Sequence, residues 1–132
     1  MAGYSNKPLY KKLGIKPGAS WTVVHPPDHY LEMLGDDHPE VFGGALHFLN
    51  GVHVFVKDLK TLTSVVGQWK NAIKKDGMIW ISWYKKASGI ATDVTEDTIR
   101  AVALPEGLVD VKVCAVDDQR SGLKLVWRKE LR

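Results

Sequence analysis

Apolar and polar residues alternate along the second half of the chain in blocks that predict strands and helices in turn. Residues 52–57 predict a strand, and from Leu59 apolar residues recur at helical spacing until Gly77. Residues 78–84 then form a second predicted strand that is apolar on both faces. One face carries Met78, Trp80 and Tyr84, and the other carries Ile79, Ile81 and Trp83. Such a strand belongs at the centre of a parallel sheet with helices on either side, which predicts an α/β protein.

The end of the chain predicts one more helix and a hairpin. Asp93 and Glu96 have the spacing of a capping box, which should open a helix over residues 93–104. Residues 108–116 and 122–128 alternate strictly and predict an antiparallel hairpin at or near the edge of the sheet. The side chains expected to face the core are Val109, Val111, Val113 and Ala115 in the first strand and Leu123, Leu125 and Trp127 in the second.

The first half of the chain is less regular. A short basic helix is expected over residues 7–15, a buried strand over 21–25 and a second helix over 27–34. Residues 36–50 contain a proline, two glycines and two aspartates that break any period, although a short strand could form at 40–42.

Composition indicates one packed domain. With 132 residues, 45% of them hydrophobic, the chain predicts a single domain over residues 1–132, with residues 1–8 as a disordered tail. No segment approaches the roughly 20 consecutive apolar residues of a membrane span, and no signal-peptide pattern is present, so we expect a cytoplasmic protein without a membrane partner. The net charge of +3 is small, which argues against nucleic acid as a partner.

Several segments carry a resemblance to known families. The opening 13–18 (LGIKPG), the 75–77 segment (KDG) before the central strand and the terminal hairpin resemble the Rossmann-like fold of the S-adenosylmethionine (SAM) methyltransferases. Segments 83–89, 92–96 and 107–114 are similar to an uncharacterised family of short bacterial proteins, which implies no known activity. The resemblance implies a three-layer, truncated methyltransferase-like sheet of about five or six strands, mostly parallel, that ends in the antiparallel hairpin.

One part of the methyltransferase pattern is missing. In those enzymes the first strand ends in a glycine-rich loop that lets the backbone approach the cofactor. Here the same place is residues 25–28 (HPPD), where two prolines remove two amide donors. Residues 35–50 are also too few for two further strands with helices between them. We therefore expect no cofactor.

Three other groups of residues could support chemistry but have simpler interpretations. His25 and His29 have the four-residue spacing of metal ligands on a helix, but Pro26 opposes helical geometry at His25. The loop residues Asp36, Asp37, His38 and Glu40 are typical of a solvated turn. Cys114, the only cysteine, excludes an internal disulfide and should pack as a small apolar side chain. We therefore expect no metal site.

The segment that follows the predicted central strand, residues 84–92, has the composition of an anion site. It contains Lys85, Lys86, Ser88, Gly89 and Thr92. Two ammonium groups, two hydroxyls and a permissive glycine suit phosphate or carboxylate, and ligands of open parallel sheets bind beyond the carboxyl ends of the strands. The residues expected to share this rim are His25, Asp28 and Asp58. A solvated polar loop is the alternative interpretation.

The sequence thus predicts a small anionic ligand as the partner and assigns no catalytic residue. Our main hypothesis is a non-enzymatic ligand-binding or regulatory module on a methyltransferase-like fold. The alternative is a small enzyme that uses the same rim, either a divergent methyltransferase or another transferase or hydrolase that employs Asp28, Asp58 or Lys86.

Overall fold

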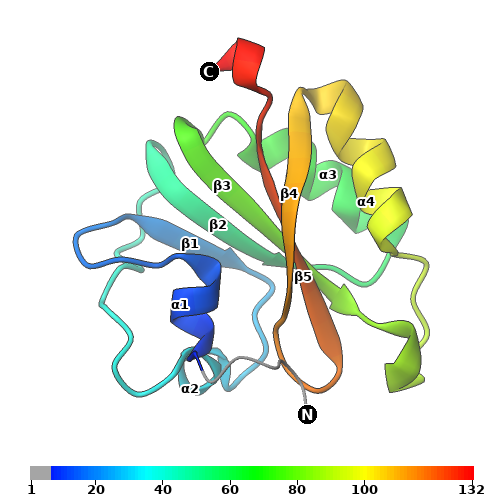
Figure 1. Ribbon diagram of the computed structural model, residues 1–132, viewed down its shortest axis with the longest axis horizontal. Coiled ribbons are helices and arrows are strands. Elements are labelled where there is room, and N and C mark those ends of the chain that lie inside the picture. Colours follow the sequence, from blue (N-terminus) through cyan, green and yellow to red (C-terminus); the bar gives the residue numbers. More distant parts are fainter. Residues whose placement is uncertain (1–6) are drawn as a thin grey trace.

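A computed structural model describes residues 7–132, which form a five-stranded sheet between two layers of helices (Figure 1). The strands are β1 (Trp21–Val24), β2 (Leu49–Phe55), β3 (Ile73–Tyr84), β4 (Leu108–Ala115) and β5 (Arg120–Trp127). The helices are α1 (Leu9–Leu13), α2 (Tyr30–Leu34), α3 (Leu59–Trp69) and α4 (Glu96–Ala103), with short 3-10 turns at Lys86–Ser88, Leu104–Glu106 and Lys129–Leu131. Most of the predicted tail lies outside the described residues, and Pro8 is already the N-cap of α1.

The strand order is β1-β2-β3-β5-β4. β1, β2 and β3 run parallel, whereas β5 pairs antiparallel with both β3 and β4. The α/β class, the strand number, the central place of β3 and the hairpin at the sheet edge are therefore confirmed. The expectation of a mostly parallel sheet is only partly right, because the hairpin makes half of the strand pairings antiparallel.

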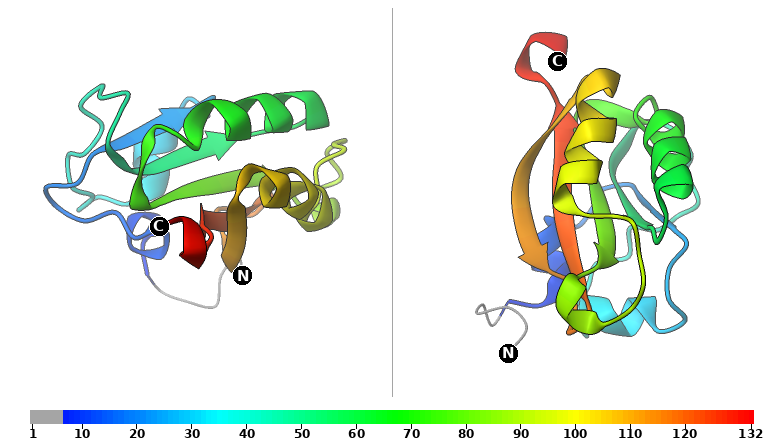
Figure 2. Two further views of the ribbon diagram at one scale, coloured as in Figure 1. Left: turned by 90° about the horizontal axis from the view of Figure 1, so that it is seen from above. Right: turned by 90° about the vertical axis from the view of Figure 1, so that its right-hand side faces the viewer.

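The sheet separates two hydrophobic clusters. Figure 2 shows α3 and α4 over one face and α1 on the opposite side of the sheet. Side chains of α3 and α4 pack with Ile79, Ile81 and Trp83 in the larger cluster. The smaller cluster joins α1 and α2 to Trp21 and Trp80, and the Trp80 Nε1–H donates to the Leu13 carbonyl over 2.9 Å. The two-faced pattern predicted for β3 is thus confirmed.

All four predicted helices are shorter in the structure, and the contacts around α3 and α4 show why those two differ. The helix expected to reach Gly77 ends at Trp69, and the chain turns at residues 70–72 and enters β3 at Ile73. Ile73 is buried as a strand residue opposite Leu49, although its spacing also fits the helix. In α4 the capping box is formed by Thr95 and Thr98. Asp93 instead accepts a hydrogen bond from the Leu59 backbone N–H (2.8 Å) and so holds the start of α3.

The strand predictions need two corrections. Val111 and Val113, expected in the core, are 54% and 47% exposed. β4 is the edge strand and its register shifts between Asp110 and Lys112, so the strict alternation of the sequence does not continue as alternating burial. No strand forms at residues 40–42, where a hydrogen bond from the Trp21 N–H to the Val41 carbonyl is not continued as a ladder.

Candidate functional site

The carboxyl ends of β1, β2 and β3 meet at one edge of the sheet, where the turn between β4 and β5 joins them (Figure 1). A cavity of about 390 Å³ opens at this edge. We call it the edge cavity and define it by six of its lining residues: His25, Phe55, Lys57, Ser82, Tyr84 and Arg120. Its position is the one at which open parallel sheets bind ligands.

Arg120 supplies a fixed cation at the wall of the edge cavity. Its side chain is only 14% exposed, and its Nη1 donates to the Asp117 carboxylate over 2.6 Å while its Nη2 donates to the Tyr84 hydroxyl over 3.1 Å. The guanidinium also lies 4.8 Å from the centre of the Tyr84 ring and 5.6 Å from that of Phe55. A guanidinium has five N–H groups, so several remain for a ligand oxygen after these two contacts.

A buried chain of polar side chains, Tyr30, His53 and Ser82, reaches the edge cavity at Ser82, and we call it the floor chain. His53 Nδ1 lies 2.8 Å from the Tyr30 hydroxyl, and His53 Nε2 lies 2.6 Å from Ser82 Oγ. Parallel pairing of β2 with β3 places His53 and Ser82 on the face that Tyr30 of α2 covers. His53 is fully buried, and burial lowers its pKa to about 3, so the imidazole is neutral. Burial also raises the pKa of Tyr30, which keeps its phenol protonated.

His25 has a backbone conformation that usually selects glycine. Its φ is +55°, in the left-handed region, and it is followed by Pro26 and Pro27. The turn at the end of β1 therefore bends as a glycine turn would, but with an exposed histidine side chain and without the two proline N–H groups. A residue held in this region is strained, and such residues gather at functional sites.

The carboxylates expected at this rim have different surroundings. Asp58 lines the edge cavity, but it is the N-cap of α3 and accepts a hydrogen bond from the Thr61 backbone N–H over 2.7 Å. That bond holds the pKa of Asp58 below its ordinary value. Asp28 is exposed in the turn between β1 and α2 and does not line the edge cavity.

The loop at residues 84–92 uses its hydroxyls to fix its own shape. Ser88 Oγ accepts from the Ile90 N–H, and Thr92 Oγ1 donates to the Lys57 carbonyl and accepts from the Val94 N–H. Gly89 has a φ of +74°, which closes the 3-10 turn at Lys86–Ser88.

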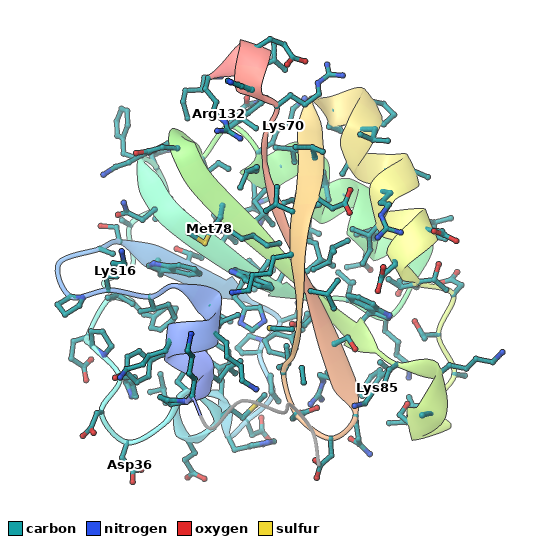
Figure 3. All side chains as sticks on the ribbon, in the orientation of Figure 1. Lys16, Asp36, Lys70, Met78, Lys85 and Arg132 are labelled. Carbon is teal, nitrogen blue, oxygen red and sulfur yellow. The ribbon has the colours of Figure 1, made fainter. Side chains whose placement is uncertain are left out.

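A second hollow, of about 810 Å³, lies beside this loop, and we call it the loop hollow. Its lining includes four of the predicted residues, Lys85, Lys86, Gly89 and Thr92, together with Glu96 and Asp97. In Figure 3 Lys85 lies at the end of β3 beside the β4–β5 turn, where its N–H donates to the Gln119 carbonyl. The structure thus divides the predicted residues: His25 and Asp58 line the edge cavity, four others line the loop hollow, and Ser88 and Asp28 line neither.

The site residues predicted from the sequence did not include Arg120, Tyr30, His53 or Ser82. One signal was present, because His53 and Ser82 are polar residues inside the apolar runs 52–56 and 78–83, and buried polar groups need partners. Arg120 gave no such signal, since it lies in the polar segment between the two strands that the sequence predicts for the hairpin.

The other groups considered in the sequence do not form a metal site. Among residues 7–132, no group of three or more His, Cys, Asp or Glu side chains is placed to hold a metal ion.

Cys114 is half-buried against the smaller cluster, and burial raises the pKa of its thiol to about 11, which fits a packing role. Within residues 7–132, no helix is long and apolar enough to cross a membrane.

Comparison with known proteins gives the fold. The sequence matches no protein-family model and no curated protein sequence. Among solved structures, the chain is similar to the ribosomal protein L11 methylase of Lactobacillus delbrueckii subsp. bulgaricus, with a TM-score of 0.55, 9% identity and coverage of 89% of this chain and 74% of that one. It is also similar to magnesium protoporphyrin IX methyltransferase from Synechocystis PCC 6803, determined with bound SAM, with a TM-score of 0.58, 9% identity and coverage of 91% and 74%.

A third similar structure is a putative type 11 methyltransferase from Sulfolobus solfataricus, with a TM-score of 0.52, 14% identity and coverage of 91% and 78%. These likenesses establish a Rossmann-like, methyltransferase-like fold, as the sequence resemblance implied. At identities of 9–14% they establish the fold alone. The closer resemblance to a family of short bacterial proteins stays a prediction.

The resemblance implies a SAM site at the end of β1, but the residues there do not fit the cofactor. A cradle for the cofactor needs backbone N–H groups and close approach of the backbone. Pro26 and Pro27 have no N–H, and their rings line the edge cavity where the backbone would have to approach.

Proposed function

We propose that the protein binds a small oxyanion, a phosphate or a carboxylate, in the edge cavity and acts as a ligand-binding or regulatory module rather than as an enzyme. The observation that carries this proposal is the placement of Arg120. Its guanidinium is held by Asp117 and Tyr84 and stacked on aromatic rings, with N–H groups left over at the cavity wall. A planar cation fixed in advance binds carboxylate or phosphate with little loss of side-chain entropy.

Two further features support an anion. Lys57 lines the same cavity and is exposed, so a second positive charge is within reach of the ligand. The one carboxylate among the lining residues, that of Asp58, is already bound to the Thr61 N–H. The lining of the edge cavity therefore carries two cationic side chains, Lys57 and Arg120, against the one carboxylate of Asp58.

The loop hollow is the competing location for the anion. Lys85 and Lys86 line it, but so do Glu96 and Asp97. The Arg100 guanidinium there forms ion pairs with Glu96 at 2.7 Å and with Asp97 at 3.1 Å. An anion at Arg100 would have to compete with these two carboxylates and with that of Asp110, whereas Arg120 has, among the described residues, the single carboxylate partner Asp117, so we place the ligand in the edge cavity.

The enzyme alternative has weaker support from the geometry. Acid–base or nucleophilic catalysis needs reactive groups that face one another across a substrate. Asp58 caps α3, Asp28 lines neither cavity, and Lys86 lines the loop hollow instead of the edge cavity. The three residues suggested for catalysis therefore do not converge on one reacting centre.

Titration of the 15N-labelled protein with inorganic phosphate and with acetate, followed by amide NMR, tests the proposal. We expect shifts at Lys57, Ser82 and Arg120, and weaker binding by Lys57→Ala. Lys60→Ala is the matched control, because it removes the same charge one turn further along without removing a residue of the edge cavity. Shifts confined to residues 85–92, abolished by the double variant Lys85→Ala/Lys86→Ala, would move the site to the loop hollow. Turnover of a phosphate or acyl ester would favour the enzyme alternative.

A further inference from the structure

The floor chain contains three polar groups that, in the part of the protein the structure describes, have only one another as side-chain partners. Among residues 7–132, the Tyr30 hydroxyl bonds only to His53 Nδ1, and Ser82 Oγ bonds only to His53 Nε2. Because His53 is neutral in the folded protein, its ring has one N–H donor and one acceptor nitrogen. The hydrogen atoms of the chain can therefore be arranged in two ways.

In the first arrangement Tyr30 donates to His53 Nδ1, and the Nε2–H donates to Ser82 Oγ. The hydrogens of Tyr30 and His53 then each have an acceptor, and the hydroxyl hydrogen of Ser82, a residue that lines the edge cavity, remains to donate into it. In the second arrangement Ser82 donates to Nε2, and the Nδ1–H donates to the Tyr30 oxygen. The phenol hydrogen of Tyr30 then has no acceptor among the described residues, although Tyr30 is buried.

The environment of Tyr30 decides between these arrangements. Its ring is packed among Phe42, His53 and Phe55, which offer aromatic edges and faces but no oxygen. A buried donor without an acceptor is costly. Ser82 is as buried as Tyr30, but Ser82 lines the edge cavity and Tyr30 does not, so the Ser82 hydroxyl can donate to water or a ligand there. The first arrangement is therefore the stable one.

We infer that the Tyr30–His53–Ser82 chain directs its donors towards the edge cavity, so that Ser82 presents an O–H donor to the bound ligand. This inference rests on the proposed function and refines it, because Ser82 becomes a residue that determines specificity. Arg120 can only donate hydrogen bonds, and the oriented Ser82 also donates. The ligand must then present acceptor oxygens to both residues, as a phosphate or a carboxylate does and an amine or a free amide N–H does not.

The tautomer of His53 can be measured without any ligand. Long-range 1H–15N correlation spectra at pH 7 distinguish a ring protonated at Nε2 from one protonated at Nδ1. We expect the Nε2–H form for the wild-type protein. We also expect Tyr30→Phe to remove this preference, because the phenol donor that fixes Nδ1 as an acceptor is gone. A wild-type ring protonated at Nδ1, or at both nitrogens, would overturn the inference.

The ligand contact is tested with inorganic phosphate. Ser82→Ala should weaken phosphate binding by about tenfold, the usual effect of removing a hydrogen bond to a charged group. Thr63→Val is the matched control: it removes a hydroxyl that bonds to the Leu59 carbonyl on the exposed side of α3, and it should leave the affinity unchanged. Unchanged affinity of a folded Ser82→Ala variant would overturn the ligand contact while leaving the anion site intact. If wild-type protein bound no phosphate in the edge cavity, the proposed function would fail with the contact, and the His53 tautomer would still decide the orientation of the chain.

Discussion

Acidification from pH 7 to pH 5 should destabilise this protein through a single side chain, His53. Burial lowers the pKa of His53 from 6.5 to about 3 in the folded protein. Between these values only the unfolded chain binds a proton at this position, so the free energy of unfolding falls as the pH falls. The stability that comes from keeping His53 neutral is complete above about pH 6.5 and is lost progressively towards pH 3.

The size of the effect follows from the same two values. A pH of 5 lies about 1.5 units below the pKa of the unfolded histidine, which is therefore mostly protonated. The folded histidine is still neutral at this pH. Each pH unit corresponds to about 1.36 kcal/mol, so the loss between pH 7 and pH 5 should be about 2 kcal/mol. This is a substantial part of the stability of a typical domain.

Urea unfolding followed by tryptophan fluorescence at pH 7, 6 and 5 measures the loss. The comparison is His53→Gln, whose amide offers one donor and one acceptor to the same neighbours but does not titrate. Other titrating groups act equally in both proteins, so the difference between their pH profiles reports His53. We expect the wild-type protein to lose about 2 kcal/mol more than the variant. Equal losses would refute the buried, neutral state of His53.

Four further predictions concern other parts of the structure. Gly51→Ala should cost about 1–3 kcal/mol in urea unfolding, because a Cβ at Gly51 would lie 2.5 Å from ring carbons of buried Trp21. His25→Gly should leave the melting temperature unchanged or raise it, whereas His25→Val should lose about 1–2 kcal/mol, because a branched side chain is poorly accommodated in the left-handed region. Ile81→Ala should cost about 2–5 kcal/mol, and a loss below about 1 kcal/mol would contradict the central place of β3. Calorimetry with SAM should show no binding below millimolar concentration, and micromolar affinity would restore the methyltransferase hypothesis.

The fold was largely readable from local patterns. A strand that is apolar on both faces can bury them only at the centre of a sheet that is covered on both sides. β3 has this pattern, and it lies at the centre of the sheet. The errors occurred where one pattern fits two structures. Ile73 continues the helical spacing of α3, but pairing with Leu49 makes it a strand residue. Val111 and Val113 alternate correctly, but no local pattern reports the register shift at the sheet edge.

The site was less predictable because it depends on residues that are distant in the sequence. His25, Lys57 and Ser82 share a cavity only because β1, β2 and β3 are neighbours in the sheet. Arg120 reaches that cavity because β5 pairs with β3 and places it opposite Tyr84. The sequence predicted a polar rim at this edge, but the identity of the cations that line the edge cavity required the strand order.

The division of the core into two clusters has a consequence for local opening of the molecule. α1 and α2 have five residues each, too few for stable helices on their own, so their structure depends on the smaller cluster. That side of the sheet should therefore open more readily than the side covered by α3 and α4. Tyr30 begins α2 and is also the first member of the floor chain, so each opening of α2 breaks that chain. The proposed ligand, bound at Ser82, would therefore be linked to the closing of α2 and would stabilise the weaker half of the protein.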